Sequence, residues 1–254
     1  DGHCMVMGSA STMAVCTEAL GMMVPGAAAI PATHHERLHK AQETGKAIVE
    51  LVKKGITPKK IMTRKAFENA IRVLMAVGGS TNAVIHLIAI ARRLGIRLSL
   101  DDFDKLSQTT PFLANLRPAG KYQMQDFYYA GGVPALLKEM ASLIHLDERT
   151  VIDKTIAEVI ADVTVSKNYR HVIRTLDDPL YEDGGIVTLK GNLVPNGALI
   201  KPKAASKHLL KHKGKAVVFD SIEDMENRID DPNLDVTADS VLILRNAGPI
   251  GAPG

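Results

Sequence analysis

The sequence predicts an α/β protein in which a mainly helical α/β part, residues 1–162, precedes a β-rich, barrel-like domain, residues 163–254. Three observations support this fold class. Apolar residues recur at helical spacing in the first part, turn-forming Asp, Gly and Pro gather near residues 163–185, and short β-branched runs follow them. With 254 residues, the chain has room for one large domain or two ordinary ones.

The helices of the first part are predicted from apolar spacing and from capping residues. We expect Ser11 or Thr12 to cap the first helix, Thr63 the third, and Asp101 or Asp102 a further short helix. The predicted helical ranges are 12–23, 34–54, 64–78, 78–96, 128–140 with its Gly-Gly turn, and 150–160.

The second part is predicted to be built from short strands with a single helix among them. Ser221 is the expected N-cap of that helix, at 221–229, with Asp224 near its third position. Since the last strand is followed directly by a Gly/Pro loop, we expect the barrel-like domain to be incomplete at its C-terminus. The predicted strands are 185–191, 197–201, 215–219 and 240–245.

Composition excludes several classes of protein. No apolar run approaches the roughly 18 residues of a membrane helix, so we expect no membrane partner. The net charge of +3 is mild, and no aromatic residues accompany the lysines around 203–215, so we expect no nucleic-acid partner. His208 and His212 have the i, i+4 spacing of metal ligands, but the lysines around them favour a solvated basic face.

Two cysteines make no disulfide framework, which indicates a reducing compartment and a cytoplasmic location. Cys4 lies beside His3, just before the first predicted helix, where a thiolate would gain from helix-end N–H groups. The alternative is a small buried side chain without a function, which is also how we interpret Cys16, in the middle of a helix.

A glycine- and hydroxyl-rich turn, Gly78 to Asn82, precedes an apolar segment, 83–91, that we expect to form a helix buried on all sides. The turn offers free N–H groups and a positive dipole end, and its Ser80, Thr81 and Asn82 need polar partners if they are buried. The turn is therefore a candidate for binding a substrate carboxylate or hydroxyl. Ordinary helix capping is the alternative.

Several stretches together resemble one family, the dihydroxy-acid and sugar-acid dehydratases. They occur in the family's order along the whole chain: GHCMVMGSASTMAVCTEALGMMVPGAAAIPA, AVGGSTNAVIHLIAIARRLGI, FYYAGGVPALLKEM, GGIVTLKGNLVPNGALIKPKAAS and LRNAGPIGAPG. The segments GHC and RNAGP are more similar to the aldonate dehydratases, of arabinonate or xylonate type, than to the branched-chain biosynthetic enzyme.

The resemblance implies a hydro-lyase that converts a 2,3-dihydroxy carboxylic acid into a 2-keto-3-deoxy acid. It implies an iron–sulfur cluster, 2Fe–2S or 4Fe–4S, as Lewis acid on the C3 hydroxyl, and Mg²⁺ at the carboxylate and C2 oxygen. By this resemblance Cys4 is a cluster ligand, His3 is its neighbour, and Ser80, Thr81 and Asn82 bind substrate.

The resemblance also implies what the chain lacks. In the family, two cluster cysteines and most Mg²⁺ ligands, including a modified lysine, precede the segment that begins here, and an acidic ligand and a serine base follow it. We therefore expect a central piece of a longer polypeptide, in which no catalytic base is assignable. The family further implies a homodimer or homotetramer acting on a small sugar acid.

Two alternatives remain. One is a dihydroxyacid dehydratase of branched-chain amino-acid synthesis, and the other is a catalytically inactive scaffold of the same fold.

Overall fold

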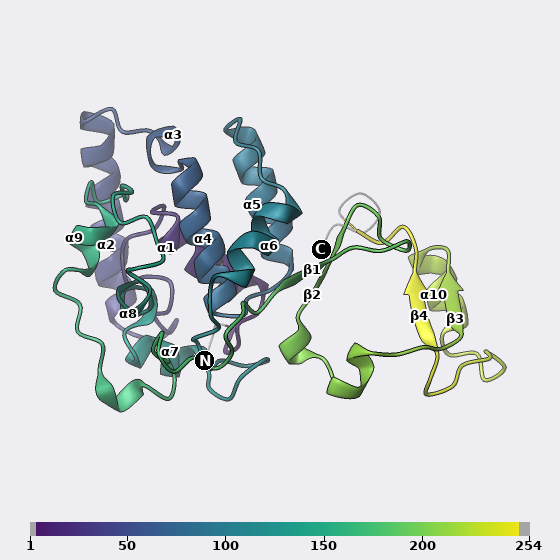
Figure 1. The fold of residues 1–254 in the computed structure, drawn as a ribbon. Helices are drawn as coiled ribbons and strands as arrows, with labels where there is room; N and C mark the ends of the chain where they lie inside the picture. Colours follow the sequence, from purple (N-terminus) through teal and green to yellow (C-terminus); the bar gives the residue numbers. More distant parts are fainter. Residues whose placement is uncertain (1–3, 249–254) are drawn as a thin grey trace. The chain divides into compact units, whose positions relative to one another are not determined.

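A computed structural model describes residues 4–248, which belong to two compact units, Asp1–Ala204 and Ala205–Gly254. The first unit contains nine α-helices among its described residues, together with one antiparallel strand pair (Figure 1). Its helices are α1 (Ser9–Ala19), α2 (Glu36–Lys53), α3 (Pro58–Ile61), α4 (Arg64–Ala76), α5 (Asn82–Arg93), α6 (Leu100–Gln108), α7 (Met124–Tyr129), α8 (Gly132–Glu139) and α9 (Ile156–Ile160), with short 3₁₀ turns at Lys167–Tyr169 and Pro202–Ala204.

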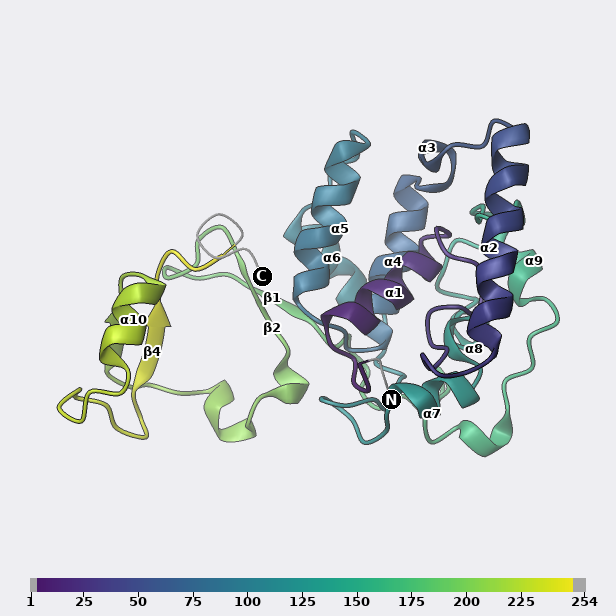
Figure 2. The ribbon, with the colours of Figure 1, turned by 180° about the vertical axis from the view of Figure 1, so that it is seen from behind.

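Helix α4 is the centre of the first unit. It packs against α1, α5 and α6, and the two opposite views show these helices close around it (Figures 1 and 2). Phe67, Ile71 and Leu74 are fully buried, and Val73 and Ala76 on the opposite side of α4 belong to a second apolar cluster shared with α7 and α8. The helix that the sequence placed at 64–78 therefore connects two cores.

The expectation of a helix buried on all sides was wrong for α5. Ala83, Val84, Leu87 and Ala91 are buried, but Ile85 on the opposite face is 45% exposed. Helix α5 packs on α1 and α4 along one face only, because no described element covers its other face. Helix α4 comes nearer to all-round burial, because only Lys65 is exposed and Arg64, Glu68 and Arg72 on the same face are half-buried.

Several predicted helix boundaries also move. Helix α1 begins at Ser9 with Gly8 as N-cap, so Ser11 and Thr12 lie inside the helix rather than at its cap. Helix α6 is capped by Ser99, whose backbone N–H and hydroxyl both bind the Asp102 carboxylate, rather than by Asp101 or Asp102.

The helix predicted at 150–160 is shorter in the structure. Thr155 caps it and α9 begins at Ile156, because residues 150–154 form a turn with Asp153 at a positive φ of 59°. Two predicted caps are confirmed: Thr63 accepts the Ala66 N–H, and Ser221 accepts the Asp224 N–H.

All four predicted strands form, but they make two separate pairs. Strands β1 (Val187–Leu189) and β2 (Ala198–Ile200) are antiparallel, with Val187 opposite Ile200. In the second unit, β3 (Ala216–Phe219) and β4 (Val241–Leu244) are parallel and connected through α10 (Ile222–Arg228), after a 3₁₀ turn at Lys207–Leu210. No closed barrel is formed by residues 4–248, so the barrel-like form of the second part is not confirmed.

The segment from 163 to 204 packs with the helices and belongs to the first unit. Val172 and Ile173 join the apolar cluster of α7 and α8, and Ile186 joins that of α4 and α5. The compact units therefore divide at 204/205, although the composition changes near 162. The division into domains at 162/163 stays a prediction. None of the helices formed by residues 4–248 has the length and hydropathy needed to cross a bilayer.

Candidate functional site

Cys4 lies in a loop that leads into α1, and its thiol is exposed. The Sγ atom donates to the Val6 carbonyl at 3.3 Å, and the Ser11 hydroxyl donates to the Cys4 carbonyl at 3.4 Å. The loop passes close to Gly8, where an added Cβ would lie 3.4 Å from the thiol sulfur. The accessible Cys4 thiol is thus held next to the N-terminus of an 11-residue helix.

The turn before α5 lies against this same end of α1. The Ser9 hydroxyl is 3.0 Å from the Ser80 hydroxyl and accepts the Asn82 side-chain amide at 2.8 Å. The buried Thr12 hydroxyl accepts the Ser80 backbone N–H at 3.0 Å. Two of the three predicted substrate-binding residues, Ser80 and Asn82, are therefore bonded to the helix that follows Cys4.

Two glycines allow this close approach. Gly78 has a positive φ of 54°, a region that glycine occupies without strain, and an added Cβ there would lie 2.6 Å from the Phe112 ring. At Gly79 an added Cβ would lie 2.5 Å from the Thr12 methyl group. A side chain at either position would push the turn away from α1.

Thr81, the third predicted residue, is half-buried at the N-cap of α5, and its hydroxyl makes no hydrogen bond within residues 4–248. The Ser80 hydroxyl of the same turn is bonded to Ser9 and Asn82, so the Thr81 hydroxyl is the one that is available to a ligand. His3 lies outside the described residues, so its predicted place beside Cys4 stays a prediction.

The N-termini of α1 and α5 meet at this hydroxyl network. The first N–H groups of a helix have no partner within it, and the helix dipole places partial positive charge at that end. Two such ends beside an exposed thiol form a surface that suits anions: a substrate carboxylate, or a thiolate that binds metal.

The second cysteine is not part of this site. Cys16 is fully buried in α1, its Sγ lies 3.8 Å from the Ala70 carbonyl, and burial raises the pKa of its thiol to about 12. It is therefore an inert core residue, as its place in the sequence predicted.

The donor set fits an iron–sulfur cluster in part. Cys4 offers one accessible thiol, and no other cysteine in the described part of the chain is able to join it. No cluster of three His, Cys, Asp or Glu side chains within residues 4–248 is arranged to hold a metal ion by itself. Within residues 4–248, Cys4 is therefore suited to supply a single thiolate ligand to such a cluster, and the described residues offer no second thiol for it.

The residues that the sequence analysis missed are Ser9 and Thr12. Thr12 was expected to cap α1, and Ser9 was assigned no role. No local pattern distinguishes these hydroxyls from others, because their partners are at least 68 residues away in the sequence.

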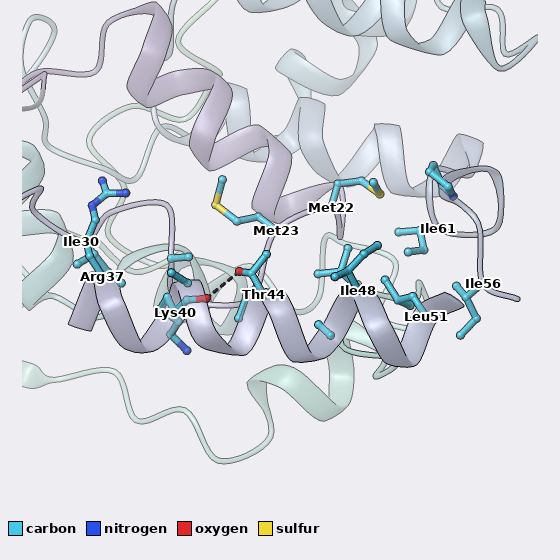
Figure 3. Close-up of a pocket in the computed structure, with 16 residues that line it drawn as sticks. Met22, Met23, Ile30, Arg37, Lys40, Thr44, Ile48, Leu51, Ile56 and Ile61 are labelled. Atoms are coloured by element: carbon cyan, nitrogen blue, oxygen red, sulfur yellow. Dashed lines mark hydrogen bonds between the residues drawn. The ribbon is translucent and has the colours of Figure 1, made fainter. Parts of the chain in front are cut away.

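A separate apolar cavity of about 720 Å³ lies along α2 (Figure 3). None of Cys4, Ser80, Thr81 and Asn82 lines it. The cavity lining is mostly apolar and contains no carboxylate, which leaves it without an acid–base pair for catalysis. Its walls include Met22, Met23, Ile48, Leu51, Ile56 and Ile61.

The loop that connects α1 to α2 is held by a buried carboxyl group. Glu18 is 4% exposed and accepts the backbone N–H groups of Gly26 at 2.6 Å and Ala28 at 2.9 Å. Burial raises the pKa of Glu18 to about 7, although these two donors and the charge of Lys40 act to lower it. Glu18 is separate from the Cys4 site and has a structural role.

Comparison with known proteins identifies the family to which the chain belongs. The dihydroxy-acid/6-phosphogluconate dehydratase N-terminal model matches residues 1–159, and the C-terminal model of the same family matches residues 171–254. The chain therefore belongs to the dihydroxy-acid/6-phosphogluconate dehydratase family.

Individual relatives include both sugar-acid and dihydroxy-acid dehydratases. An L-arabinonate dehydratase of Rhizobium leguminosarum bv. trifolii is 51% identical over 93% of the chain and 41% of its own length. A putative dehydratase of Rhizobium meliloti is 49% identical over 100% of the chain and 44% of its own length. A dihydroxy-acid dehydratase of Methanococcoides burtonii is 46% identical over 100% of the chain and 46% of its own length. The chain thus spans less than half the length of these relatives.

Proposed function

We propose that this chain is part of a hydro-lyase that removes water from a 2,3-dihydroxy sugar acid to give a 2-keto-3-deoxy acid. The observation that carries the proposal is the bonding of the Ser80–Asn82 turn to the helix that follows Cys4. Two segments that resemble functional motifs of one family, and are far apart in the sequence, meet at one polar surface.

The reaction requires help at two atoms of the substrate. Hydroxide is a poor leaving group from C3, and the carboxylate has to be held while the C2 proton is lost. When bound, an iron–sulfur cluster with Cys4 as one ligand would supply a Lewis acid for the C3 hydroxyl, and Mg²⁺ would supply a hard cation for the oxygens at C1 and C2.

In this proposal, the residues of this chain bind and orient the substrate. The Cys4 thiolate would be one ligand of the cluster, the Thr81 hydroxyl would contact the substrate, and Ser80 and Asn82 would keep the turn in place. The N-termini of α1 and α5 orient the carboxylate. The base that takes the C2 proton is not assigned to any residue of this chain.

The substrate class is inferred from the relatives. Those named L-arabinonate and L-arabonate dehydratase are 51% and 49% identical to the chain, which favours an aldonate. The relatives named dihydroxy-acid dehydratase, at 44–46%, keep a branched-chain dihydroxy acid as the second candidate. We also propose a cytoplasmic enzyme that assembles as a homodimer or homotetramer.

The test is an assay of the polypeptide that contains this chain, reconstituted anaerobically with iron, sulfide and Mg²⁺. We expect visible iron–sulfur absorbance and a 2-keto-3-deoxy product from at least one aldonate in a panel that also includes a branched-chain dihydroxy acid. Cys4→Ser is expected to lose both the absorbance and the product, and Cys16→Ser serves as the matched control.

Each result has a defined meaning. Product from the branched-chain acid alone would replace the aldonate by the second candidate. A protein with bound cluster but no product from any acid in the panel would support the inactive scaffold. Absorbance that survives Cys4→Ser would remove Cys4 from the metal centre.

A further inference from the structure

The first turn of α1 is bonded on both of its sides by hydroxyl groups. On one side the Ser11 hydroxyl donates to the Cys4 carbonyl at 3.4 Å. On the other side the Ser9 hydroxyl meets Ser80 and Asn82, and the Thr12 hydroxyl accepts the Ser80 N–H. This single helical turn therefore connects the loop that carries Cys4 with the turn that carries Thr81.

The packing around this connection restricts which side chain can stand at position 12. Thr12 is fully buried, so the Ser80 N–H has no water to replace the threonine hydroxyl. The Thr12 methyl group fills the space beside Gly79, where even a Cβ would not fit. A hydroxyl and a methyl group are thus both required at position 12, which is the combination that threonine supplies.

We propose that Ser9 and Thr12 are positioning residues, which fix the place of the Cys4 thiol relative to the turn of residues 78–82. This inference rests on the proposed function for its biological meaning, since a centre held at Cys4 and a substrate held at Thr81 must be a set distance apart. Neither side chain takes part in the reaction itself.

The experiment measures the reactivity of the Cys4 thiol in the polypeptide that contains this chain, prepared without metal. The polypeptide is alkylated with iodoacetamide, and modification at Cys4 and Cys16 is followed by mass spectrometry. Cys16 is an internal control, because its fully buried thiol reacts only when the chain unfolds. Amide hydrogen exchange at Ser80 is measured in parallel.

For Ser9→Ala and Ser80→Ala we expect the alkylation rate at Cys4 to rise about fivefold, the factor that corresponds to the net loss of one hydrogen bond. The double variant should show little more than Ser9→Ala alone, because Ser9→Ala already removes the contact between the two serine hydroxyls as well as the one to Asn82. Thr81→Ala is the matched control, since Thr81 lies in the same turn but its hydroxyl makes no bond to α1.

For Thr12→Val we expect exchange of the Ser80 amide to accelerate about tenfold or more, and Thr12→Ser should restore protection in part. If Thr12→Val does not fold, the Ser9 and Ser80 variants decide the question alone. Cys4 rates that stay within about twofold of the parent, with Cys16 unreactive throughout, would overturn the proposal.

The outcome is independent of catalysis. A chain that positions Cys4 through Ser9 and Thr12 but belongs to an inactive scaffold would pass this test and fail the activity assay. A dehydratase that is active but whose alkylation rate at Cys4 is unchanged by these substitutions would fail this test and pass the activity assay.

Discussion

Helices α2 and α4 have similar apolar patterns in the sequence but very different surroundings in the structure. Phe67, Ile71 and Leu74 of α4 are fully buried, whereas Leu38 and Val52 of α2 are 73% and 72% exposed. Leu51 is the one residue of α2 that is buried. The comparison shows that helical periodicity identifies a helix and its apolar face, but not the presence of a partner for that face.

The largest expected difference between the two helices is the stability lost when an apolar side chain is truncated to alanine. Phe67→Ala in α4 should lower the free energy of unfolding by about 3–5 kcal/mol, because it removes a fully buried ring from a packed core. Leu38→Ala in α2 should change it by less than about 0.5 kcal/mol. Urea unfolding of both variants measures this contrast, and similar losses would show that α2 is buried in solution.

The second effect concerns Glu18, which holds the loop between α1 and α2. Its pKa is raised from 4.5 to about 7 in the folded chain. From pH 4.5 to 7 the folded state therefore keeps a proton that the unfolded state has released, so the free energy of unfolding should fall as pH rises through this window. The linked loss is on the order of 3 kcal/mol.

Denaturant unfolding at pH 4 and pH 8, on either side of the two pKa values, measures this loss. Glu18→Gln cannot ionise and should flatten the profile, although it keeps only one of the two carboxyl oxygens that accept from Gly26 and Ala28. A profile that is unchanged by this substitution would assign the pH dependence to another group.

The third effect concerns the N-caps. The Thr63 hydroxyl caps α4 by accepting the Ala66 N–H and also donates to Glu148, so Thr63→Ala should cost about 1 kcal/mol or more. His35 at the N-cap of α2 makes no side-chain cap bond, and His35→Ala should be nearly neutral. Thermal unfolding of the two variants compares them, and an equal loss of stability would contradict this difference.

The smallest effect is a gain of stability in α2. Gly45 lies in the helix interior, and an added Cβ would meet nothing within 4 Å. Gly45→Ala should therefore stabilise the chain by about 0.5–1 kcal/mol through helix propensity alone. Gly79→Ala is the opposing case, because its Cβ would collide with Thr12. A destabilised Gly45→Ala variant would indicate that another molecule approaches α2 closely.

The sequence by itself determined the local structure of this chain. Periodicity and caps predicted most of the helices, although not α3 or α7, because a helix depends on contacts between residues near one another in the sequence. The β-branched runs predicted all four strands, but not which strands pair. The family motifs also singled out Cys4, Ser80 and Asn82, and the family models confirm that family. Helix boundaries were less certain, as the start of α1 at Ser9 and the Ser99 cap show.

Only the tertiary structure decided which apolar faces are covered and which polar groups meet. Nothing in the local pattern of α4 or α5 indicates that α4 lies between two cores and α5 has an exposed face. Likewise, the pairing of Ser9 and Thr12 with residues near 80 follows from the packing of α1 against α4 and α5. Such contacts depend on the whole fold, since each joins residues whose separation in the sequence gives no sign that they will meet.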